Sequence, residues 1–255
     1  MYINKYLKFS KDKNNISQQI IKSLILKDIN DQYMIEKKNL YQIYKLNYYI
    51  IHCIEHTNRS EYINKIEYKL NRPIILFNGI YTKNISLNNQ ITYINNFDKN
   101  IKSSFKFNKT YQIGCYLSHF KIIEKIMNSN LNNNYSIIFE DDVYFGKYLD
   151  FKIYKIIQDL NNLNKDFDLI FLGSCNYNKG EHLINNIYYL DSNKYCWGSH
   201  ALLIKNKNIK KIYTLNCNIT HEIDNHYTLL IKNNKLNGFV INPPLCFQNS
   251  KLINS

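Results

Sequence analysis

Short apolar segments alternate along the chain with longer stretches in which apolar residues recur every three or four positions. The short segments are typical of buried strands, and the longer stretches are typical of amphipathic helices. Strands are predicted near residues 48–54, 74–77, 136–140 and 168–172. Helices are predicted over residues 58–70, 111–130 and 148–163. Strands that alternate with helices favour an α/β/α sandwich on a mainly parallel sheet with right-handed crossovers.

The remaining parts of the chain have a less regular pattern. Residues 1–45 contain one stretch of helical spacing, and we expect a helical flank there, outside a main domain of residues 46–255. Residues 81–110 are rich in Asn and read as a variable loop with one short strand at 91–97. Beyond Cys175 a smaller second half is expected. Its predicted strands are residues 187–191, 195–204 and 238–247, and its predicted helices are residues 206–215 and 221–233.

The charge of the chain favours an anionic partner. The formal net charge is +13 over 255 residues, and 45% of the residues are hydrophobic, enough for a sizeable core. The Lys surplus also fits compositional drift in an A/T-rich genome such as that of a large DNA virus, because Asn, Ile and Tyr are abundant as well. No compact basic block carries interleaved aromatic residues, which argues against a nucleic-acid groove.

The six cysteines are scattered, with no CxxC pair and no spacing typical of a zinc site. A chain of this length does not need a disulfide scaffold, so free thiols in a reducing compartment are expected. The first residues lack the apolar core of a signal peptide, and no apolar run reaches membrane-spanning length. We therefore expect a cytoplasmic protein without a transmembrane segment, located in host cytoplasm or a virion if the source is viral.

The segment "YSIIFEDDVYF" (Tyr135–Phe145) carries three adjacent acids at the end of the most strand-like run. Ligands of open α/β sheets bind beyond the carboxyl ends of strands, and clustered carboxylates there suit Mg²⁺ or Mn²⁺ shared with substrate phosphates. The alternative is a helix N-cap, where acids accept hydrogen bonds from free N–H groups. No glycine-rich phosphate cradle is present, so a bound diphosphate must be neutralised by a metal and by side chains.

Seven segments carry a recognisable pattern, and in chain order they are "YYIIHCIEHTNRSEYI", "IGCYLSHFKIIEKI", "IIFEDDVYF", "FDLIFLGS", "WGSHALLIKNKNIKKI", "HEIDNHYTLL" and "INPPLCFQNSKL". In this order they resemble the motifs of glycosyltransferase family 25, which includes lipooligosaccharide and procollagen galactosyltransferases. The resemblance covers about residues 46–255 and implies a GT-A-like, Rossmann-type α/β/α sandwich with a smaller acceptor-side half.

The resemblance implies transfer of a hexose, galactose or glucose, from a UDP-sugar to a hydroxyl of a glycan, lipooligosaccharide or collagen-like acceptor. Inversion needs one carboxylate as general base and one cation, Mn²⁺ or Mg²⁺, on the leaving diphosphate. Asp142 is the expected metal ligand, and either Glu140 or Asp141 is expected to assist it. The remaining acid would accept hydrogen bonds from the ribose hydroxyls. Asp224 is the expected base, with Glu222 as the second candidate. The expected donor-binding residues are Arg59, Gly114, Ser118, His119, Asp141, Gly198, Ser199, His200, Gln248 and Ser250.

Three departures from the family pattern keep other functions open. Asn225 follows Asp224 where the family often has a second acid, and His52 and Cys53 stand near its usual Asn-Leu. A retaining sugar transferase, a catalytically inactive protein of this fold and a nucleic-acid binder are the alternatives. Trp197, the only Trp, either stacks on a sugar ring or fills the core. The oligomeric state is not predicted.

Overall fold

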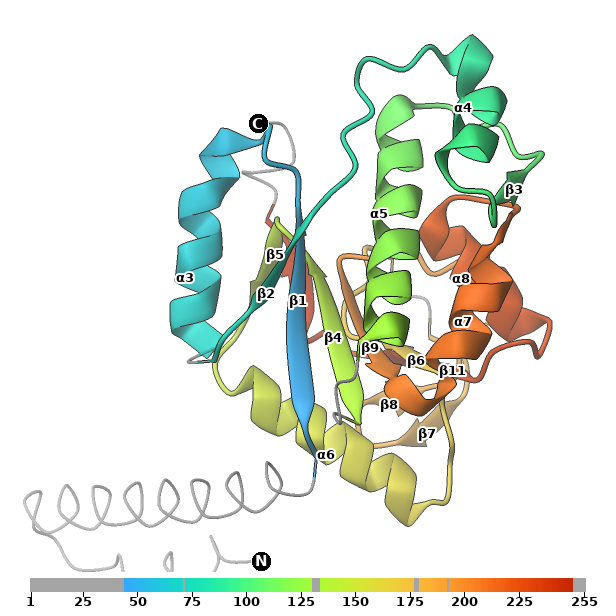
Figure 1. Cartoon of the computed structure of the whole chain (residues 1–255). Helices are drawn as coiled ribbons and strands as arrows, with labels where there is room; N and C mark the ends of the chain where they lie inside the picture. Colours follow the sequence, from blue (N-terminus) through green and yellow to red (C-terminus); the bar gives the residue numbers. More distant parts are fainter. Residues whose placement is uncertain (1–43, 71, 130–133, 177–178, 192, 250–255) are drawn as a thin grey trace, which may run out of the picture. The chain divides into compact units, whose positions relative to one another are not determined.

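The computed structural model describes residues 44–70, 72–129, 134–176, 179–191 and 193–249 (Figure 1). The helical flank expected over residues 1–45 therefore lies outside the described residues, apart from Tyr44 and Lys45. Within the described ranges, no helix has both the length and the apolar character needed to cross a membrane.

An eight-stranded sheet forms the centre of the described chain, in the order β2-β1-β4-β9-β6-β11-β8-β7. Its strands are β1 (Leu46–His52), β2 (Ile75–Asn78), β4 (Tyr135–Glu140), β6 (Leu169–Phe171), β7 (His182–Ile184), β8 (Ile187–Tyr188), β9 (Ala201–Lys205) and β11 (Gly238–Ile241). Strand β1 is parallel to β2 and β4, and β11 is parallel to β6. Strand β9 is antiparallel to both of its neighbours, β4 and β6, so these two run in the same direction. Strand β8 is likewise antiparallel to both of its neighbours, β11 and β7. Six of the eight strands therefore run in one direction, with β9 and β8 reversed, and the four strands predicted for the first half are confirmed.

Two small sheets fasten loops to this centre. Strand β3 (Lys102–Ser103) pairs with β10 (Asn218–Ile219), and β5 (Val143–Phe145) pairs with β12 (Cys246–Gln248). The second pair matters for the site, because it brings the last described residues beside the segment that follows β4.

Helices cover both faces of the central sheet (Figure 1). Alternation along β1 explains why both faces need cover: Tyr49 and Ile51 pack into the core with α5, whereas Tyr48 and Ile50 point to the opposite face and are equally buried. Helices α5, α7 and α8 lie together on the first face, and α3 and α6 lie on the other side. The helices are α3 (Ser60–Leu70), α4 (Gln90–Phe97), α5 (Thr110–Asn128), α6 (Leu149–Asn162), α7 (Ile209–Asn216) and α8 (Ile223–Lys232), with single 3₁₀ turns η2 (Thr57–Arg59), η3 (Leu87–Asn89) and η4 (Asn206–Asn208). The result is the Rossmann-like α/β/α sandwich that the sequence predicted.

The strand predicted at residues 91–97 is wrong, because this segment is helix α4. Ile91 and Tyr93 suggested alternation, but the buried apolar residue is Ile94, and the Tyr93 ring lies 6.2 Å from the tilted ring of Phe97, one helical turn later. Helical spacing therefore decides which side of the segment meets the core.

Two predicted strands of the second half are shorter than expected. Residues 195–200 are irregular, and β9 begins only at Ala201, because side chains take the backbone N–H groups of Cys196 and Gly198. The strand predicted over 238–247 is divided into β11 and β12 by Pro243 and Pro244, which cannot donate to a ladder.

Candidate active site

The candidate site lies at the carboxyl end of β4, where the three adjacent acids are found. Glu140 is the last residue of β4, and Asp141 and Asp142 form the turn into β5. Strand β9 enters the sheet beside β4 at the same edge, directly after Ser199 and His200, and the Glu140 N–H donates to the His200 carbonyl at 3.0 Å. The motif after β4 and the segment before β9 are therefore side by side, as expected for ligand binding at this edge.

Glu140 is held by three side chains. Its Oε1 accepts from Ser199 Oγ at 2.7 Å, lies 3.2 Å from His119 Nε2, and is approached by Cys115 Sγ at 3.6 Å. Burial by itself raises the pKa of the Glu140 carboxyl, but the hydrogen bonds from His119 and Ser199 outweigh burial and lower the pKa to about 2. Glu140 is therefore a stable carboxylate that positions α5 and the segment before β9.

Asp141 is held from the other side, by His52 at the end of β1 and by Arg59 in the 3₁₀ turn that follows β1. Arg59 Nη1 donates to Asp141 Oδ1 at 2.5 Å, and His52 Nδ1 lies 2.8 Å from Asp141 Oδ2. All three side chains are buried. The acid that the sequence assigned to metal or ribose is thus already paired with a guanidinium.

Asp142 differs from its two neighbours because one of its carboxylate oxygens is buried without a hydrogen-bond partner among the described residues. Its Oδ1 is buried and has no hydrogen-bond partner among the described residues, and the nearest Arg59 nitrogen is 3.9 Å from its Oδ2. Burial, reinforced by the negative charge of Glu140, raises the pKa of Asp142 to about 7. A buried carboxylate with a free oxygen fits an oxygen-preferring divalent cation, which would neutralise it.

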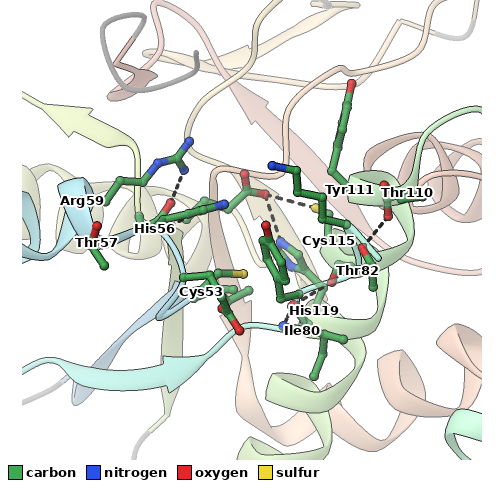
Figure 2. Close-up of a pocket in the computed structure, with 18 of the residues that line it drawn as sticks. Cys53, His56, Thr57, Arg59, Ile80, Thr82, Thr110, Tyr111, Cys115 and His119 are labelled. Atoms are coloured by element: carbon green, nitrogen blue, oxygen red, sulfur yellow. Dashed lines mark hydrogen bonds and ion pairs between the residues drawn. The ribbon is translucent and has the colours of Figure 1, made fainter. Parts of the chain in front are cut away.

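A pocket of about 730 Å³ opens between the end of β1, the loop after β2 and the first turns of α5 (Figure 2). Glu140 and Asp141 line one end of it. The rest of the lining includes His56, Arg59, Tyr81, Lys83, Tyr111 and Ser118. The volume is that of an ordinary small-molecule site, and the cations and aromatic rings suit a nucleotide.

Gly114 and Ser118 line the pocket and also fix its shape. A Cβ on Gly114 would lie 2.4 Å from the Ile80 carbonyl oxygen and 2.7 Å from Thr82 Oγ1, so only glycine lets α5 approach this loop. Ser118 Oγ accepts from the Ile80 N–H at 2.7 Å and donates to the Gly114 carbonyl at 2.6 Å. Both predicted residues therefore fix the distance between α5 and the loop after β2.

Asp224 lies in the first turn of α8. A hydrogen bond from Gly198 links it to the segment before β9, which lies at the carboxyl end of β4. Its Oδ2 accepts from the Gly198 N–H at 2.9 Å, and its Oδ1 accepts from the Asn225 N–H at 2.7 Å. Burial raises the pKa of Asp224, although these two backbone hydrogen bonds oppose the shift. Gly198 has a φ of +110°, which favours glycine, and its chain neighbour Ser199 donates to Glu140.

The C-terminal strand closes the other side of the acidic turn. Gln248 is opposite Val143 in the β5–β12 pair, the Asn249 N–H donates to the Asp142 carbonyl at 2.7 Å, and Cys175 Sγ donates to Gln248 Oε1 at 3.1 Å. Ser250 lies outside the described residues. Burial raises the pKa of Cys175, and the negative charges of Glu140, Asp224 and Asp142 add to this shift.

Two other predicted residues, Glu222 and His200, make longer side-chain contacts than Asp224 does. Glu222 is the N-cap residue of α8 and makes only long contacts, at 3.4 Å to Gln112 Nε2 and 3.3 Å to Asn225 Nδ2. His200 is buried behind the site, with Nε2 3.4 Å from the Cys246 carbonyl. Trp197 is 56% exposed, which excludes the core role considered for it.

The comparison with known proteins identifies the family. The model of glycosyltransferase family 25 (LPS biosynthesis protein) matches residues 45–227, most of the described chain. The chain belongs to glycosyltransferase family 25. Its mainly parallel sheet, with acids after β4, is consistent with the GT-A fold of the resemblance.

Several curated relatives are similar over part of this domain. Procollagen galactosyltransferase 1-A of Xenopus laevis is 30% identical over 103 residues, which are 40% of this chain and 16% of that protein. Procollagen galactosyltransferase 2 of Mus musculus is 32% identical over 62 residues, 24% of this chain and 10% of that protein. The probable inactive glycosyltransferase 25 family member 3 of Rattus norvegicus is 31% identical over 72 residues, 28% of this chain and 12% of that protein. The matches thus span a small part of each relative.

The sequence did not point to several residues of the site. Tyr81, Lys83 and Tyr111 line the pocket but lie where the pattern is poorly periodic or on an exposed helix start. Cys115 belongs to a quoted motif but had no assigned role. Its spacing of four residues from His119 was the available signal, because such residues share a helix face.

Proposed function

We propose that this chain is an inverting hexosyltransferase that uses a UDP-sugar and Mn²⁺ or Mg²⁺. The donor hexose is galactose or glucose, and the acceptor is a hydroxyl of a glycan, lipooligosaccharide or collagen-like chain. The observation that carries the proposal is the Oδ1 of Asp142, which is buried without a hydrogen-bond partner among the described residues and whose chain neighbour Asp141 lines a pocket of small-molecule size. Membership in family 25 supports glycosyl transfer, and the galactosyltransferase names of the relatives support the donor.

In this proposal the pocket binds the nucleotide and the acidic turn meets the diphosphate. His56, Tyr81 and Tyr111 offer ring faces to the base, and Lys83 and Arg59 add positive charge. Asp142 would hold the cation, and the cation when bound would stabilise the negative charge of the departing diphosphate. Glu140 and Asp141 are already hydrogen-bonded or paired, so they position the segments around the turn.

Asp224 is the proposed general base. Each of its oxygens already accepts one backbone N–H, but a carboxylate oxygen has a second lone pair for an acceptor hydroxyl. Its raised pKa makes it a stronger base than an exposed Asp. The proton would pass from the acceptor hydroxyl to an Asp224 oxygen as that hydroxyl attacks the sugar.

The test measures UDP release by the purified full chain across a panel of UDP-sugars, with and without Mn²⁺. We expect turnover with one UDP-hexose and Mn²⁺, and loss of Mn²⁺-dependent UDP binding in Asp142→Asn. Asp166→Asn is the matched control, because Asp166 lies before the amino end of strand β6 and its side chain is 49% exposed. Asp142→Asn that binds UDP and Mn²⁺ like wild type would overturn the metal assignment.

Two further readouts separate the alternatives. The anomeric configuration of the product, read by NMR, distinguishes inversion from retention. UDP and Mn²⁺ binding without turnover by any donor would indicate an inactive member, as the name of the rat relative suggests for that protein. Asn225 would then be the residue to examine first, because it stands beside the proposed base.

A further inference from the structure

Three side chains of different elements converge on one corner of the pocket. Cys115 and His119 are one helical turn apart on α5, and Glu140 ends β4. Cys115 Sγ, His119 Nε2 and a Glu140 oxygen all lie within 4.8 Å of one another. Figure 2 shows the Cys115 sulfur and the His119 ring linked by dashed contacts to the same carboxylate.

The distances are those of ligands around one tetrahedral cation. Zinc bonds of about 2.3 Å to sulfur and about 2.1 Å to nitrogen and oxygen place sulfur and oxygen about 3.6 Å apart, and nitrogen and oxygen about 3.4 Å apart. The observed separations from Glu140 Oε1 are 3.6 Å to Cys115 Sγ and 3.2 Å to His119 Nε2. Ser199 Oγ lies beside this group, 2.7 Å from the same oxygen and 3.8 Å from Cys115 Sγ.

We propose that Cys115, His119 and Glu140 form a second cation site, specific for a thiophilic divalent ion such as Zn²⁺. Binding replaces the S–H bond of Cys115 by a sulfur–metal bond, and the released proton goes to solvent. The thiolate and the Glu140 carboxylate together carry two negative charges, which balance the ion. A sulfur, nitrogen and oxygen ligand set favours Zn²⁺ over Mg²⁺ or Mn²⁺.

This site is expected to be exchangeable rather than structural. Metal binding at Nε2 moves the His119 ring proton to Nδ1, which is buried and has no hydrogen-bond partner among the described residues. Tight zinc sites usually give that second ring nitrogen an acceptor, and its lack weakens the site. The ion would also bind the Glu140 oxygen that now accepts a hydrogen bond from Ser199 and contacts His119.

The consequence for transfer rests on the proposed function. Cys115, His119 and Glu140 all line the donor pocket, so an ion bound there reduces donor binding while Asp142 remains free for Mn²⁺. Zn²⁺ at low concentration should therefore inhibit a Mn²⁺-supported reaction, and a strong chelator of zinc should restore it.

The experiment uses Co²⁺ as an optical substitute for Zn²⁺ on the chelator-treated full chain. A Co²⁺–thiolate site gives an ultraviolet charge-transfer band, and tetrahedral Co²⁺ gives strong visible bands. We expect both bands in wild type and their loss when Zn²⁺ is added. In Cys115→Ser and His119→Gln the affinity for Co²⁺ should be lower by about tenfold or more, because losing even a residue that only supports a metal ligand costs about 10–100-fold in affinity.

Cys53→Ser is the matched control, because Cys53 lines the same pocket and is also a free cysteine. It should keep both bands. The proposal is overturned by a wild type without a charge-transfer band, by a band that survives in Cys115→Ser, or by a band that disappears in Cys53→Ser. Circular dichroism checks folding, and His119→Gln decides the question if Cys115→Ser does not fold. The spectra need no donor sugar, so they stand even if no UDP-sugar is turned over.

Discussion

Arg59 and Asp141 form a buried ion pair of 2.5 Å between the 3₁₀ turn after β1 and the turn after β4. His52, at the end of β1, lies 2.8 Å from the second oxygen of the same carboxylate. These contacts anchor two loops that are more than eighty residues apart in the chain. They also leave Asp142, rather than Asp141, as the acid with an unpaired oxygen.

Removing the guanidinium should strongly destabilise the fold. Arg59→Met leaves the Asp141 carboxylate buried beside Asp142, and breaking a buried pair in this way costs about 3–5 kcal/mol. Urea unfolding measures the loss. Asp166→Asn is the control, because the Lys205–Asp166 pair has the same 2.5 Å separation but a half-exposed carboxylate, so it should change stability by about 0–1 kcal/mol.

The double variant Arg59→Met/Asp141→Leu separates pairing from packing. It should regain part of the stability that Arg59→Met loses, because the Asp141 carboxylate, which Arg59→Met leaves without its guanidinium, is removed as well. Equal stability losses in Arg59→Met and Asp166→Asn would show that the buried pair has no special role.

Gly198 should not tolerate a side chain. Its φ of +110° is unfavourable for other residues, and an added Cβ would lie 2.9 Å from His200 Nδ1. We expect Gly198→Ala to reduce the free energy of unfolding by about 1–3 kcal/mol, the usual size of such backbone strain. Thermal unfolding measures it. Gly146→Ala is the control, with open space around the new Cβ, and a similar loss there would contradict the explanation.

The strands of the central sheet could be predicted because their β-branched and aromatic runs are buried on both faces. Tyr48 to Ile51 are all buried, and so are Ile137 to Phe139. Helix α4 could not be recognised, because its eight residues carry Ile and Tyr at alternating positions and only tertiary contact shows that Ile94 is the inward one.

The acidic motif could be placed at a strand end from the sequence, but the separate roles of its members could not. Those roles depend on partners that are distant in the chain: Arg59 for Asp141, and His119 and Ser199 for Glu140. The proposed zinc site was not predicted, because only Cys115 and His119 share a local spacing, four residues apart on α5, and the third ligand, Glu140, comes from β4.

His226 should make the fold sensitive to acid. Burial lowers its pKa from 6.5 to about 4, and its Nε2 is buried without a hydrogen-bond partner among the described residues. The unfolded chain binds this proton more tightly, so stability is full above pH 6.5 and is lost as the pH falls toward 4. The loss between pH 7 and pH 4 is about 3 kcal/mol from this residue.

Urea unfolding at several pH values measures that loss. His226→Asn cannot take up the proton, so its stability should depend less on pH across this window, although its stability at pH 7 is lower than that of wild type. His182→Asn is the control, because His182 is exposed on β7. Wild type and His226→Asn with the same pH slope would show that another group causes the acid sensitivity.

Asp224→Asn should separate the proposed base from donor binding. Asn keeps one acceptor oxygen and nearly the same shape, but it cannot take the acceptor proton, so transfer should fall by about 10²–10⁴-fold. UDP affinity should hardly change, because Asp224 does not line the nucleotide pocket. Glu222→Gln is the companion variant, and it should lose much less activity, since the Glu222 side chain makes no capping hydrogen bond to α8 and only long contacts among the described residues.

The pH profile adds a second readout for Asp224. A base acts only when deprotonated, and burial raises the pKa of Asp224, so kcat at saturating donor should fall as the pH drops through this raised value. In Asp224→Asn the remaining activity should lose that inflection. If Asp224→Asn loses UDP-sugar affinity in step with rate, Asp224 is a donor ligand. If Glu222→Gln shows the larger loss and Asp224→Asn keeps the inflection, the base is Glu222.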